Sequence, residues 1–370
     1  MTARTVLQVL PALVSGGVER GTLEIAEAVV GAGWRALVAS AGGPLVGPLE
    51  RLGARHVTLP LGRKSPLGIW RNAAALARLA RAEGVSILHA RSRAPAWAAL
   101  LAARRTGAHL VTTYHGAYNE GFPGKRLYNS VMARGERVIA ISGFIAEHIR
   151  LRHNTDPTRL RVIPRGVDER RFDPAKVAPA RVAALREAWN VPEGRPVVML
   201  PGRLTRWKGQ TVLLDAMPRL PGGALALLVG EGSLRRALEA RIAERGLADR
   251  VRLCGHAEDM PAALLLADVV VHASTDPEAF GRTVVEAQAM ARPVIASDLG
   301  APRETVEEGV TGWRVAPGDP DALAAAIARA LALPPSGRAA MGERGRAAVL
   351  ARYTTRAMQE ATLAVYRELP

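Results

Sequence analysis

The sequence predicts two doubly wound α/β domains, and three observations support this class. The chain has 370 residues, about twice the length of a typical domain. Short β-branched runs alternate with longer amphipathic stretches, which is typical of parallel sheets with right-handed crossovers. Prolines interrupt regular structure between residues 164 and 192, so we expect the boundary between the two domains to lie in that segment.

In the first domain, placed at residues 1–175, seven short apolar runs are predicted strands, and helical patterns fill the gaps between them. The predicted strands are Val6–Leu10, Arg35–Ala39, His56–Leu59, Ile87–Ala90, Leu110–Tyr114, Val138–Ile141 and Arg161–Ile163.

The second domain, placed at residues 176–352, repeats the alternation of strand and helix. Its predicted strands are Val197–Leu200, Leu225–Val229, Val251–Leu253, Val269–His272 and Val294–Ala296. Ala322–Ala332 is an alanine-rich predicted helix. We expect the last segment, residues 353–370, to be a helix that crosses back onto the N-terminal domain.

Composition narrows the class of protein. A hydrophobic fraction of 48% suffices for two buried cores, and a single cysteine cannot form an intramolecular disulfide. No apolar run approaches the roughly 18 residues that a membrane-spanning helix needs. The first residues lead into a predicted strand without the apolar core of a signal peptide, so we expect a cytoplasmic protein.

The net charge of +16 is concentrated in the first half of the chain. Residues 1–175 hold 25 Lys and Arg against 12 Asp and Glu, whereas residues 176–370 hold 25 against 22. Such an excess attracts nucleic acid, an anionic membrane face or a phosphorylated substrate. Only 6 Trp, 5 Tyr and 4 Phe occur, and no nucleic-acid-binding module is recognisable, which disfavours nucleic acid.

Candidate ligand-binding residues of the first domain follow its predicted strands, because active sites of open α/β sheets lie at the strands' carboxyl ends. Gly16 and Gly17 follow the first strand and allow close approach to an anionic or hydroxyl-rich ligand, although their spacing does not match the dinucleotide fingerprint. His115 follows Leu110–Tyr114. Arg91 and Arg93 follow Ile87–Ala90 and suit a phosphate, so we take them as candidates for acceptor binding.

A basic loop follows the first strand of the second domain. It presents Arg203 and Lys208 close to the start of the next helix. An arginine can clamp a diphosphate with two hydrogen bonds while a lysine supplies a compact charge, so the loop is a candidate diphosphate cradle.

Two carboxylates follow the strand Val269–His272. Glu278 precedes a helix that Gly281 opens, and Glu286 lies inside that helix. A carboxylate pair is also typical of glycosidases, but the phosphate-type features nearby favour an anionic ligand. The free amides around Gly281, Arg282 and Thr283 would accept a phosphate at the helix N-terminus.

Taken together, these motifs resemble those of retaining GT-B glycosyltransferases of family four, and the resemblance covers essentially the whole chain. It implies two Rossmann-like domains that face each other across a cleft. One residue departs from the pattern, because Arg165 stands where many relatives carry asparagine before Gly-Val-Asp. The resemblance rests on Gly16 to Arg20, His115-Gly116, Ile163 to Asp168, Gly202 to Leu204, Lys208-Gly209, Gly230 to Gly232, and the Glu-x7-Glu pair Glu278 and Glu286.

The resemblance also implies roles for individual residues. Arg203 and Lys208 would hold the diphosphate of a nucleotide-sugar donor, and Glu286 would bind its ribose. Glu278 would contact the transferred sugar, and His115 would hydrogen-bond that sugar from the opposite domain.

Two further residues, Glu231 and His256, are expected to flank the donor. No cofactor or metal is expected, because no Asp-x-Asp follows a strand and the cations together with the helix amides can neutralise the leaving diphosphate.

The expected activity is therefore that of a hexosyltransferase that retains the anomeric configuration. We expect the acceptor to be a lipopolysaccharide core, a glycolipid or a polysaccharide precursor of the cell envelope, reached from the inner face of the cytoplasmic membrane. A soluble small-molecule or sugar-phosphate acceptor is the alternative, and a non-catalytic nucleotide-sugar-binding or nucleic-acid-binding protein is a remote one.

Overall fold

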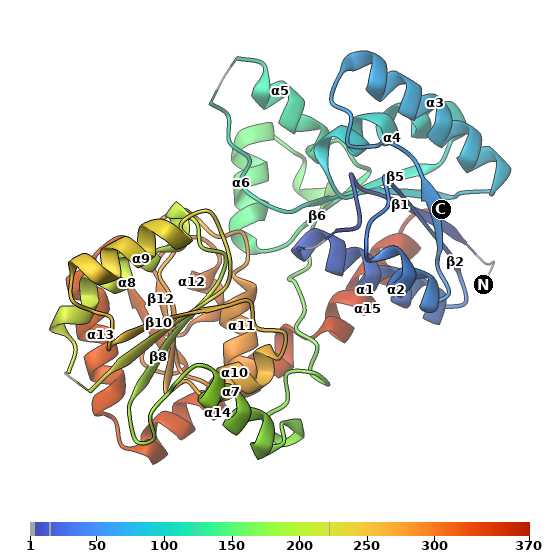
Figure 1. Cartoon of the computed structure of the whole chain (residues 1–370). Helices are drawn as coiled ribbons and strands as arrows, with labels where there is room; N and C mark the ends of the chain where they lie inside the picture. Colours follow the sequence, from blue (N-terminus) through green and yellow to red (C-terminus); the bar gives the residue numbers. More distant parts are fainter. Residues whose placement is uncertain (1–3, 15, 122, 222) are drawn as a thin grey trace. The chain divides into compact units, whose positions relative to one another are not determined.

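The computed structural model describes residues 4–14, 16–121, 123–221 and 223–370, and its chain divides into two units. Unit 1 comprises Met1–Arg165 and Thr355–Pro370, and unit 2 comprises Gly166–Thr354. Each unit is a parallel sheet with helices on both faces (Figure 1). The predicted α/β class with two doubly wound sheets is confirmed.

Among the described residues, unit 1 contains a seven-stranded parallel sheet in the order β3-β2-β1-β4-β5-β6-β7. Its strands are β1 (Thr5–Val9), β2 (Arg35–Ser40), β3 (Arg55–Thr58), β4 (Ile87–Ala90), β5 (His109–Tyr114), β6 (Arg137–Ala140) and β7 (Leu160–Val162). Its helices are α1 (Gly17–Gly31), α2 (Val46–Arg51), α3 (Pro66–Ala82), α4 (Arg93–Thr106), α5 (Lys125–Asn129), α6 (Gly143–His153) and α15 (Thr355–Arg367). All seven predicted strands are present.

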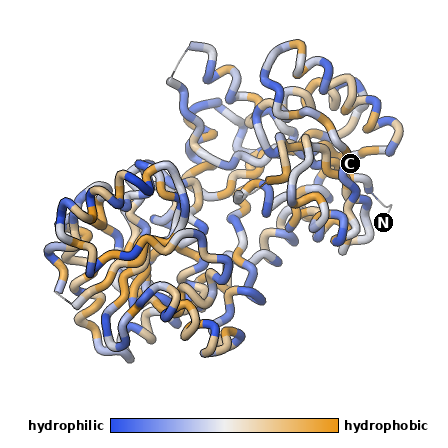
Figure 2. The backbone as a smooth tube through the Cα atoms, in the orientation of Figure 1, coloured by the Kyte–Doolittle hydropathy of each residue, from blue (hydrophilic) through white to orange (hydrophobic). Residues whose placement is uncertain are grey.

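The core of unit 1 is built from alternate strand residues and the apolar faces of α1 and α15. The hydropathy colouring shows the apolar strands inside, with hydrophilic positions spread over helices and loops (Figure 2). Central parallel strands are buried on both faces, which explains their continuous apolar runs. The core residues include Val6, Val38, Ile87, Val111 and Ile139 from the strands, Ile25 and Val29 from α1, and Met358, Val365 and Tyr366 from α15.

Hydrogen bonds and ion pairs hold the C-terminal end of α15 against the rest of unit 1. Both terminal nitrogens of Arg4 donate to carbonyls there, to Tyr366 O at 2.7 Å and to Leu369 O at 2.8 Å. The Glu368 carboxylate pairs with Arg137 and Arg161, each at 2.6 Å. Hydrogen bonds from Arg161 and Arg137 lower the pKa of Glu368 to about 2, against the opposing effect of its partial burial.

A buried hydrogen bond links α15 to the sheet, and its removal should destabilise unit 1. The Tyr366 hydroxyl lies 2.6 Å from Nδ1 of His89, whose Nε2 lies 2.6 Å from Thr113 Oγ1. We expect Tyr366→Phe to lower the free energy of unfolding by about 1–3 kcal/mol, because it leaves a buried imidazole nitrogen without a partner. Thermal unfolding measures this, with Tyr128→Phe as the control because the Tyr128 phenol makes no hydrogen bond with any described residue. Equal melting temperatures for wild type and Tyr366→Phe would contradict the assignment.

Unit 2, within the described residues, contains a six-stranded parallel sheet in the order β10-β9-β8-β11-β12-β13. Its strands are β8 (Val197–Pro201), β9 (Leu225–Val229), β10 (Val251–Gly255), β11 (Val269–His272), β12 (Val294–Ser297) and β13 (Gly312–Val315). Its helices are α7 (Pro179–Ala188), α8 (Gln210–Ala216), α9 (Arg235–Glu244), α10 (Met260–Leu265), α11 (Arg282–Ala289), α12 (Pro302–Thr305), α13 (Pro320–Ala332) and α14 (Pro335–Arg352). The strand β13 was not predicted from the sequence.

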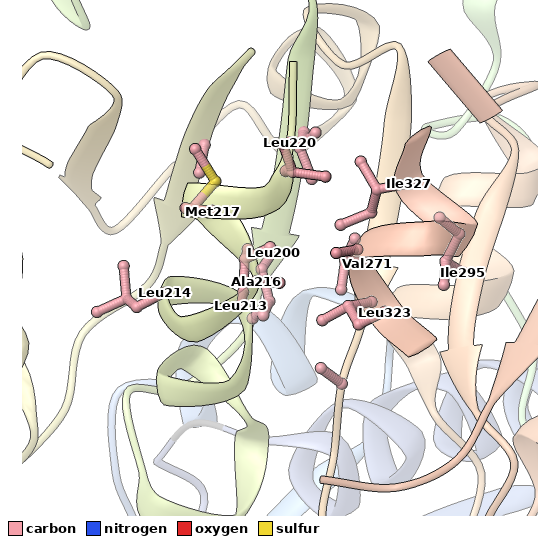
Figure 3. Packing of buried hydrophobic residues seen from close by; sticks show 14 of the residues in the cluster. Leu200, Leu213, Leu214, Ala216, Met217, Leu220, Val271, Ile295, Leu323 and Ile327 are labelled. Atoms are coloured by element: carbon pink, nitrogen blue, oxygen red, sulfur yellow. The ribbon is translucent and has the colours of Figure 1, made fainter. Parts of the chain in front are cut away.

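One face of the unit 2 sheet packs against α8 and α13. Alternate strand residues such as Leu200, Val271 and Ile295 face Leu213 of α8 and Leu323 of α13 (Figure 3). All five are at most 1% exposed. A fully buried aliphatic side chain of this kind stabilises the fold by about 1.5–3 kcal/mol, so this cluster holds the strand ends in place.

The boundary between the units lies at Arg165 rather than at residue 175. The intervening residues pack on unit 2: Val167 N donates to Tyr353 O at 2.8 Å, and Phe172 is 2% exposed. Arg346 of α14 donates to Phe172 O at 3.2 Å and pairs with Asp173 at 3.0 Å. The division after Arg165 lies inside the segment 164–192 in which the change of domain was expected, and the residues that follow it pack on unit 2.

Candidate functional site

The order of strands in unit 2 reverses between β8 and β11. β9 and β10 extend the sheet on one side of β8, and β12 and β13 extend it on the other side of β11. Ligands of open α/β sheets bind at the carboxyl ends of the strands at such a reversal. Lys208 follows β8 and Glu278 follows β11, so the fold brings the two predicted loops to this point.

Glycines permit the close approach of these loops. Gly209 has a φ of +75°, and a Cβ at this position would lie 1.8 Å from Ala273 O, so a larger residue would push the two loops apart. A hydrogen bond from Thr275 N to Trp207 O, at 2.8 Å, joins the same loops. The Glu278 carbonyl accepts from Ala301 N at 2.9 Å, which holds the backbone of the carboxylate residue against the loop after β12.

The Glu278 carboxylate is the centre of a compact polar cluster. Its Oε1 pairs with Lys208 Nζ, accepts a hydrogen bond from Ser274 Oγ at 3.3 Å and lies 3.3 Å from His272 Nε2. The side chains of Lys208 and Glu278 are 17% and 13% exposed. Lys208 Nζ also lies 4.3 Å from the centre of the Trp207 ring, a cation–π contact that adds to its placement.

This environment keeps Glu278 ionised. Burial raises the pKa of the carboxyl, but the contacts with His272 and Lys208 outweigh it and lower the pKa from its usual 4.5 to about 2. The His272 contact is one of proximity, because neither ring nitrogen makes a hydrogen bond of good geometry with a described residue. At neutral pH the site presents a carboxylate and an ammonium group side by side.

The helix α11 begins next to this pair. Gly281 has a φ of +79° and precedes the first turn, and no side chain caps the helix N-terminus. The amides of Arg282 and Thr283 therefore lie in the first turn, where an anion is favoured. Glu286, one turn further, lies 3.6 Å from Arg282 Nε and is 12% exposed.

The other predicted donor-binding residues of unit 2 line neighbouring loops but are not part of the Glu278 cluster. The Arg203 side chain is exposed and pairs with no acidic group in the part of the chain that the structure describes. Glu231 and His256 are also exposed, and they follow the adjacent strands β9 and β10. A Cβ on Gly255 would lie 3.0 Å from Glu231 Oε1, so the structure does bring the Glu231 and His256 loops together.

In unit 1 the order of strands reverses between β1 and β4. Gly16 and Gly17 follow β1, as predicted, and start α1. His115 follows β5, and its Nδ1 lies 2.8 Å from Arg165 Nη2, while Arg165 Nη1 donates to Gly17 O. The structure thus joins the glycine loop to the predicted histidine through an arginine that follows β7.

Arg91 and Arg93 are held by different partners and do not form one cradle. Arg91 is 4% exposed and donates to Gln8 Oε1 at 3.1 Å. Burial lowers its pKa to about 10, so its guanidinium stays charged at neutral pH. Arg93 donates to Asn129 Oδ1 at 2.9 Å, and its guanidinium lies 4.4 Å from the centre of the Tyr118 ring.

Three contributors to these clusters, His272, Ser274 and Arg165, were not predicted from the sequence as site residues. His272 is the last residue of β11 and Ser274 lies two residues further, so the end of the predicted strand was a usable signal for both. The contact between Arg165 and His115 joins residues that are 50 positions apart, and no local pattern indicates it.

Two family models match the chain. One, described as glycosyl transferases group 1, matches residues 182–348, and the other, described as glycosyltransferase family 4, matches residues 15–171.

Two named relatives show the range of activities among similar proteins. The chain is 34% identical, over 66% of its length and 66% of the relative's, to a GDP-mannose-dependent alpha-(1-6)-phosphatidylinositol monomannoside mannosyltransferase of Mycolicibacterium smegmatis. It is 32% identical, over 51% of its length and 55% of the relative's, to a lipopolysaccharide core biosynthesis glycosyltransferase of Rhizobium meliloti.

Solved structures match over nearly the whole chain. A glycosyltransferase from Rickettsia africae is 35% identical with a TM-score of 0.92, and the match covers 100% of this chain and 99% of that one. The Anabaena protein HepE in complex with UDP and glucose is 25% identical with a TM-score of 0.86, over 99% and 100% of the two chains. The chain therefore belongs to the GT-B glycosyltransferases described by the group 1 and family 4 models.

Proposed function

We propose that the protein moves a sugar from a nucleotide diphosphate-sugar to an acceptor of the cell envelope, with retention of the anomeric configuration and without a divalent metal. The observation that carries the proposal is the Lys208–Glu278 pair, which lies where the strand order of unit 2 reverses and beside the open N-terminus of α11.

Departure of a nucleoside diphosphate places negative charge on phosphate oxygens, and preformed positive groups aimed at those oxygens stabilise the transition state. Lys208 and the first-turn amides of α11 supply such groups. The exposed Arg203 side chain could move to contact the diphosphate when the donor binds. In the absence of a ligand, Glu278 neutralises Lys208. Binding of the diphosphate would therefore give Lys208 a second anionic partner.

Glu278 is suited to hold the transferred sugar. An ionised carboxylate with a pKa of about 2 only accepts hydrogen bonds, so it fixes the direction of each bond with sugar hydroxyls. Glu286 would bind the ribose of the donor, and His115 of unit 1 would bind the transferred sugar. Glu231 and His256, on adjacent loops, would flank the donor.

The stereochemistry and metal requirement of transfer test this proposal together. We expect the fresh product to keep the anomeric configuration of the donor, and the rate to be unchanged after treatment with EDTA, because cationic side chains and helix amides replace a divalent ion. Proton NMR of the product decides the configuration. An inverted linkage, or a rate restored only by added Mg²⁺ or Mn²⁺, would contradict the proposal.

An envelope acceptor is favoured by the relatives and by the surface of unit 1. The two named relatives act on phosphatidylinositol monomannoside and in lipopolysaccharide core synthesis. No helix of the described residues is both long and apolar enough to cross a bilayer. Docking would therefore use surface side chains.

Unit 1 carries basic and apolar side chains together at two places. Leu67 and Trp70 of α3 are 58% and 55% exposed, and exposed Arg63 and Lys64 precede this helix.

At the second place, Leu127 of α5 is 62% exposed beside a groove of about 620 Å³. The basic residues of the groove lining are Arg126, Arg134, Arg152, His153 and Arg159. Both α3 and α5 lie on the same side of the unit 1 sheet as α4 (Figure 1). Phe122, which the sequence places near Lys125, lies outside the described residues.

We expect the protein to bind anionic vesicles and not neutral ones. Each basic residue near an anionic surface contributes about 1 kcal/mol, and the attraction weakens as salt rises. Changing Arg63, Lys64, Lys125 and Arg126 to serine should abolish co-sedimentation with vesicles of anionic phospholipid. The control changes four exposed basic residues of unit 2, Arg170, Lys176, Arg236 and Arg344, to serine, which removes the same charge.

Equal losses in the two variants would show that net charge, rather than this surface, drives binding. No sedimentation with either kind of vesicle would favour the alternative acceptor, a soluble small molecule or sugar phosphate bound by Arg91 or Arg93.

A further inference from the structure

The Arg165 guanidinium is held between two parts of unit 1. The residue is 5% exposed. Its Nη1 donates to Gly17 O and its Nη2 lies 2.8 Å from His115 Nδ1. A planar guanidinium that is held at both terminal nitrogens cannot turn away from the imidazole without breaking the bond to the glycine loop.

This contact has only one possible direction. A guanidinium stays protonated and offers only donors, so Arg165 donates and His115 Nδ1 must accept. A neutral imidazole that accepts at Nδ1 carries its single proton on Nε2. A protonated imidazolium would place an N–H at Nδ1 directly against the N–H of Arg165, so protonation is disfavoured as well.

The groups around His115 also disfavour protonation of its ring. Burial, followed by the charges of Arg165, Arg91 and His89, lowers the pKa of His115 well below its usual value. Arg91 and His89 belong to β4 and the loop after it, and the acids that face Arg91 are Glu19 and Glu24 of α1.

The other ring nitrogen is left with a proton and no partner. His115 Nε2 is enclosed and makes no hydrogen bond with any residue that the structure describes. With Arg91 and Arg165, His115 lines a cavity of about 20 Å³. A buried donor without an acceptor is costly, so an oxygen atom that accepts from Nε2 would be bound favourably.

We propose that Arg165 is a positioning residue that fixes His115 as the neutral Nε2–H tautomer. His115 then donates a hydrogen bond to an oxygen of the bound sugar and takes no part in proton transfer. The tautomer follows from unit 1 alone, whereas the identity of the ligand oxygen rests on the proposed glycosyl transfer.

The tautomer can be measured without turnover. Two-bond ¹H–¹⁵N correlation spectra of the full chain labelled with ¹⁵N-histidine distinguish a protonated ring nitrogen from an unprotonated one, and His115→Gln identifies the signals. We expect Nε2 of His115 to be protonated, Nδ1 to be unprotonated, and neither to titrate between pH 5 and pH 8. The Nδ1–H tautomer, or a titration near pH 6.5, would overturn the proposal.

Substitutions of Arg165 test its role in the same spectra. Arg165→Lys keeps a donor without an acceptor, so it should preserve the Nε2–H tautomer. Arg165→Asn has a side chain too short to reach His115 Nδ1, so the ring loses this donor and His115 should show both tautomers or titrate at a higher pH. Spectra unchanged in Arg165→Asn would show that Arg165 does not set the tautomer. Circular dichroism confirms that each variant is folded.

Two amide replacements of His115 test what the ligand requires. Glutamine places its amide near the position of Nε2, and asparagine places it near Nδ1. We expect His115→Gln to keep a rate about tenfold above that of His115→Asn, the value of one hydrogen bond, and the wild-type rate to lack an acidic limb near pH 6.5. The reverse order would overturn the assignment of the donor. If the wild type turned over no nucleotide sugar, the proposed function would fail while the spectra still decided the tautomer.

Discussion

Lys208→Ala is expected to slow sugar transfer about 30- to 1000-fold, which corresponds to about 2–4 kcal/mol of transition-state stabilisation. Lys208 lies in the loop after β8, and its ammonium group is held against Glu278 and above the Trp207 ring. On the proposed function, removal of this charge would leave the departing diphosphate with the helix amides and Arg203 only. The loss should therefore fall on kcat and on kcat/KM together.

Steady-state kinetics with the purified variant measure this effect. Lys176→Ala is the matched control, because Lys176 is an exposed lysine of the same unit, 3.8 Å from Asp173. Lys208→Ala should still fold but unfold at a lower temperature than the control, because the nearly buried Glu278 carboxylate loses its ammonium partner. A Lys208→Ala rate within a fewfold of the control would remove Lys208 from the diphosphate site.

Glu278→Gln is expected to reduce the rate about 100-fold or more. The change keeps the size of the side chain but removes the negative charge that Lys208, His272 and Ser274 surround. The amide nitrogen can only donate, so one of the two positions that accept from sugar hydroxyls is lost. The rate loss should resemble that for a missing transition-state contact. Glu258→Gln, at an exposed acid of the same unit, is the control.

The same variant should change the pH dependence of stability. The pKa of Glu278 is lowered from 4.5 to about 2 in the folded protein, so its ionised form adds stability above pH 4.5. This contribution is lost as the pH falls from 4.5 toward 2. Chemical denaturation of wild type and Glu278→Gln should therefore show a stability difference that shrinks over that interval. A constant difference would contradict the lowered pKa.

Most of the fold could be predicted because hydrophobic patterning is a local signal. The predicted strands match those of the structure to within a few residues, since buried parallel strands are short continuous apolar runs. The strand β13, Gly312–Val315, was missed because a glycine and an arginine interrupt its four residues, so it contains no continuous apolar run. Its pairing with β12 and the burial of Trp313, rather than its own sequence, make it a strand.

The site was predictable where its residues follow strands, and less so where side chains meet across the sheet. Glu278 and Lys208 were found from their loops, and the reversal of strand order explains why they meet. Arg91 was expected to bind an acceptor, and its hydrogen bond to Gln8 Oε1 across the sheet is a contact that no local pattern indicates. The Arg165–His115 contact depends on the packing of three neighbouring strands and their loops.

In the proposed function, Lys208 and its neighbours in unit 2 hold the diphosphate of a nucleotide sugar. Thermal unfolding with a panel of UDP-, GDP- and ADP-sugars tests this claim most directly. At 100 times its dissociation constant, a specific ligand adds about 2.7 kcal/mol of stability. We expect at least one member of the panel to stabilise the wild type by this amount and Lys208→Ala much less. Stabilisation of both proteins to the same extent, or of neither by any nucleotide sugar, would contradict the claim.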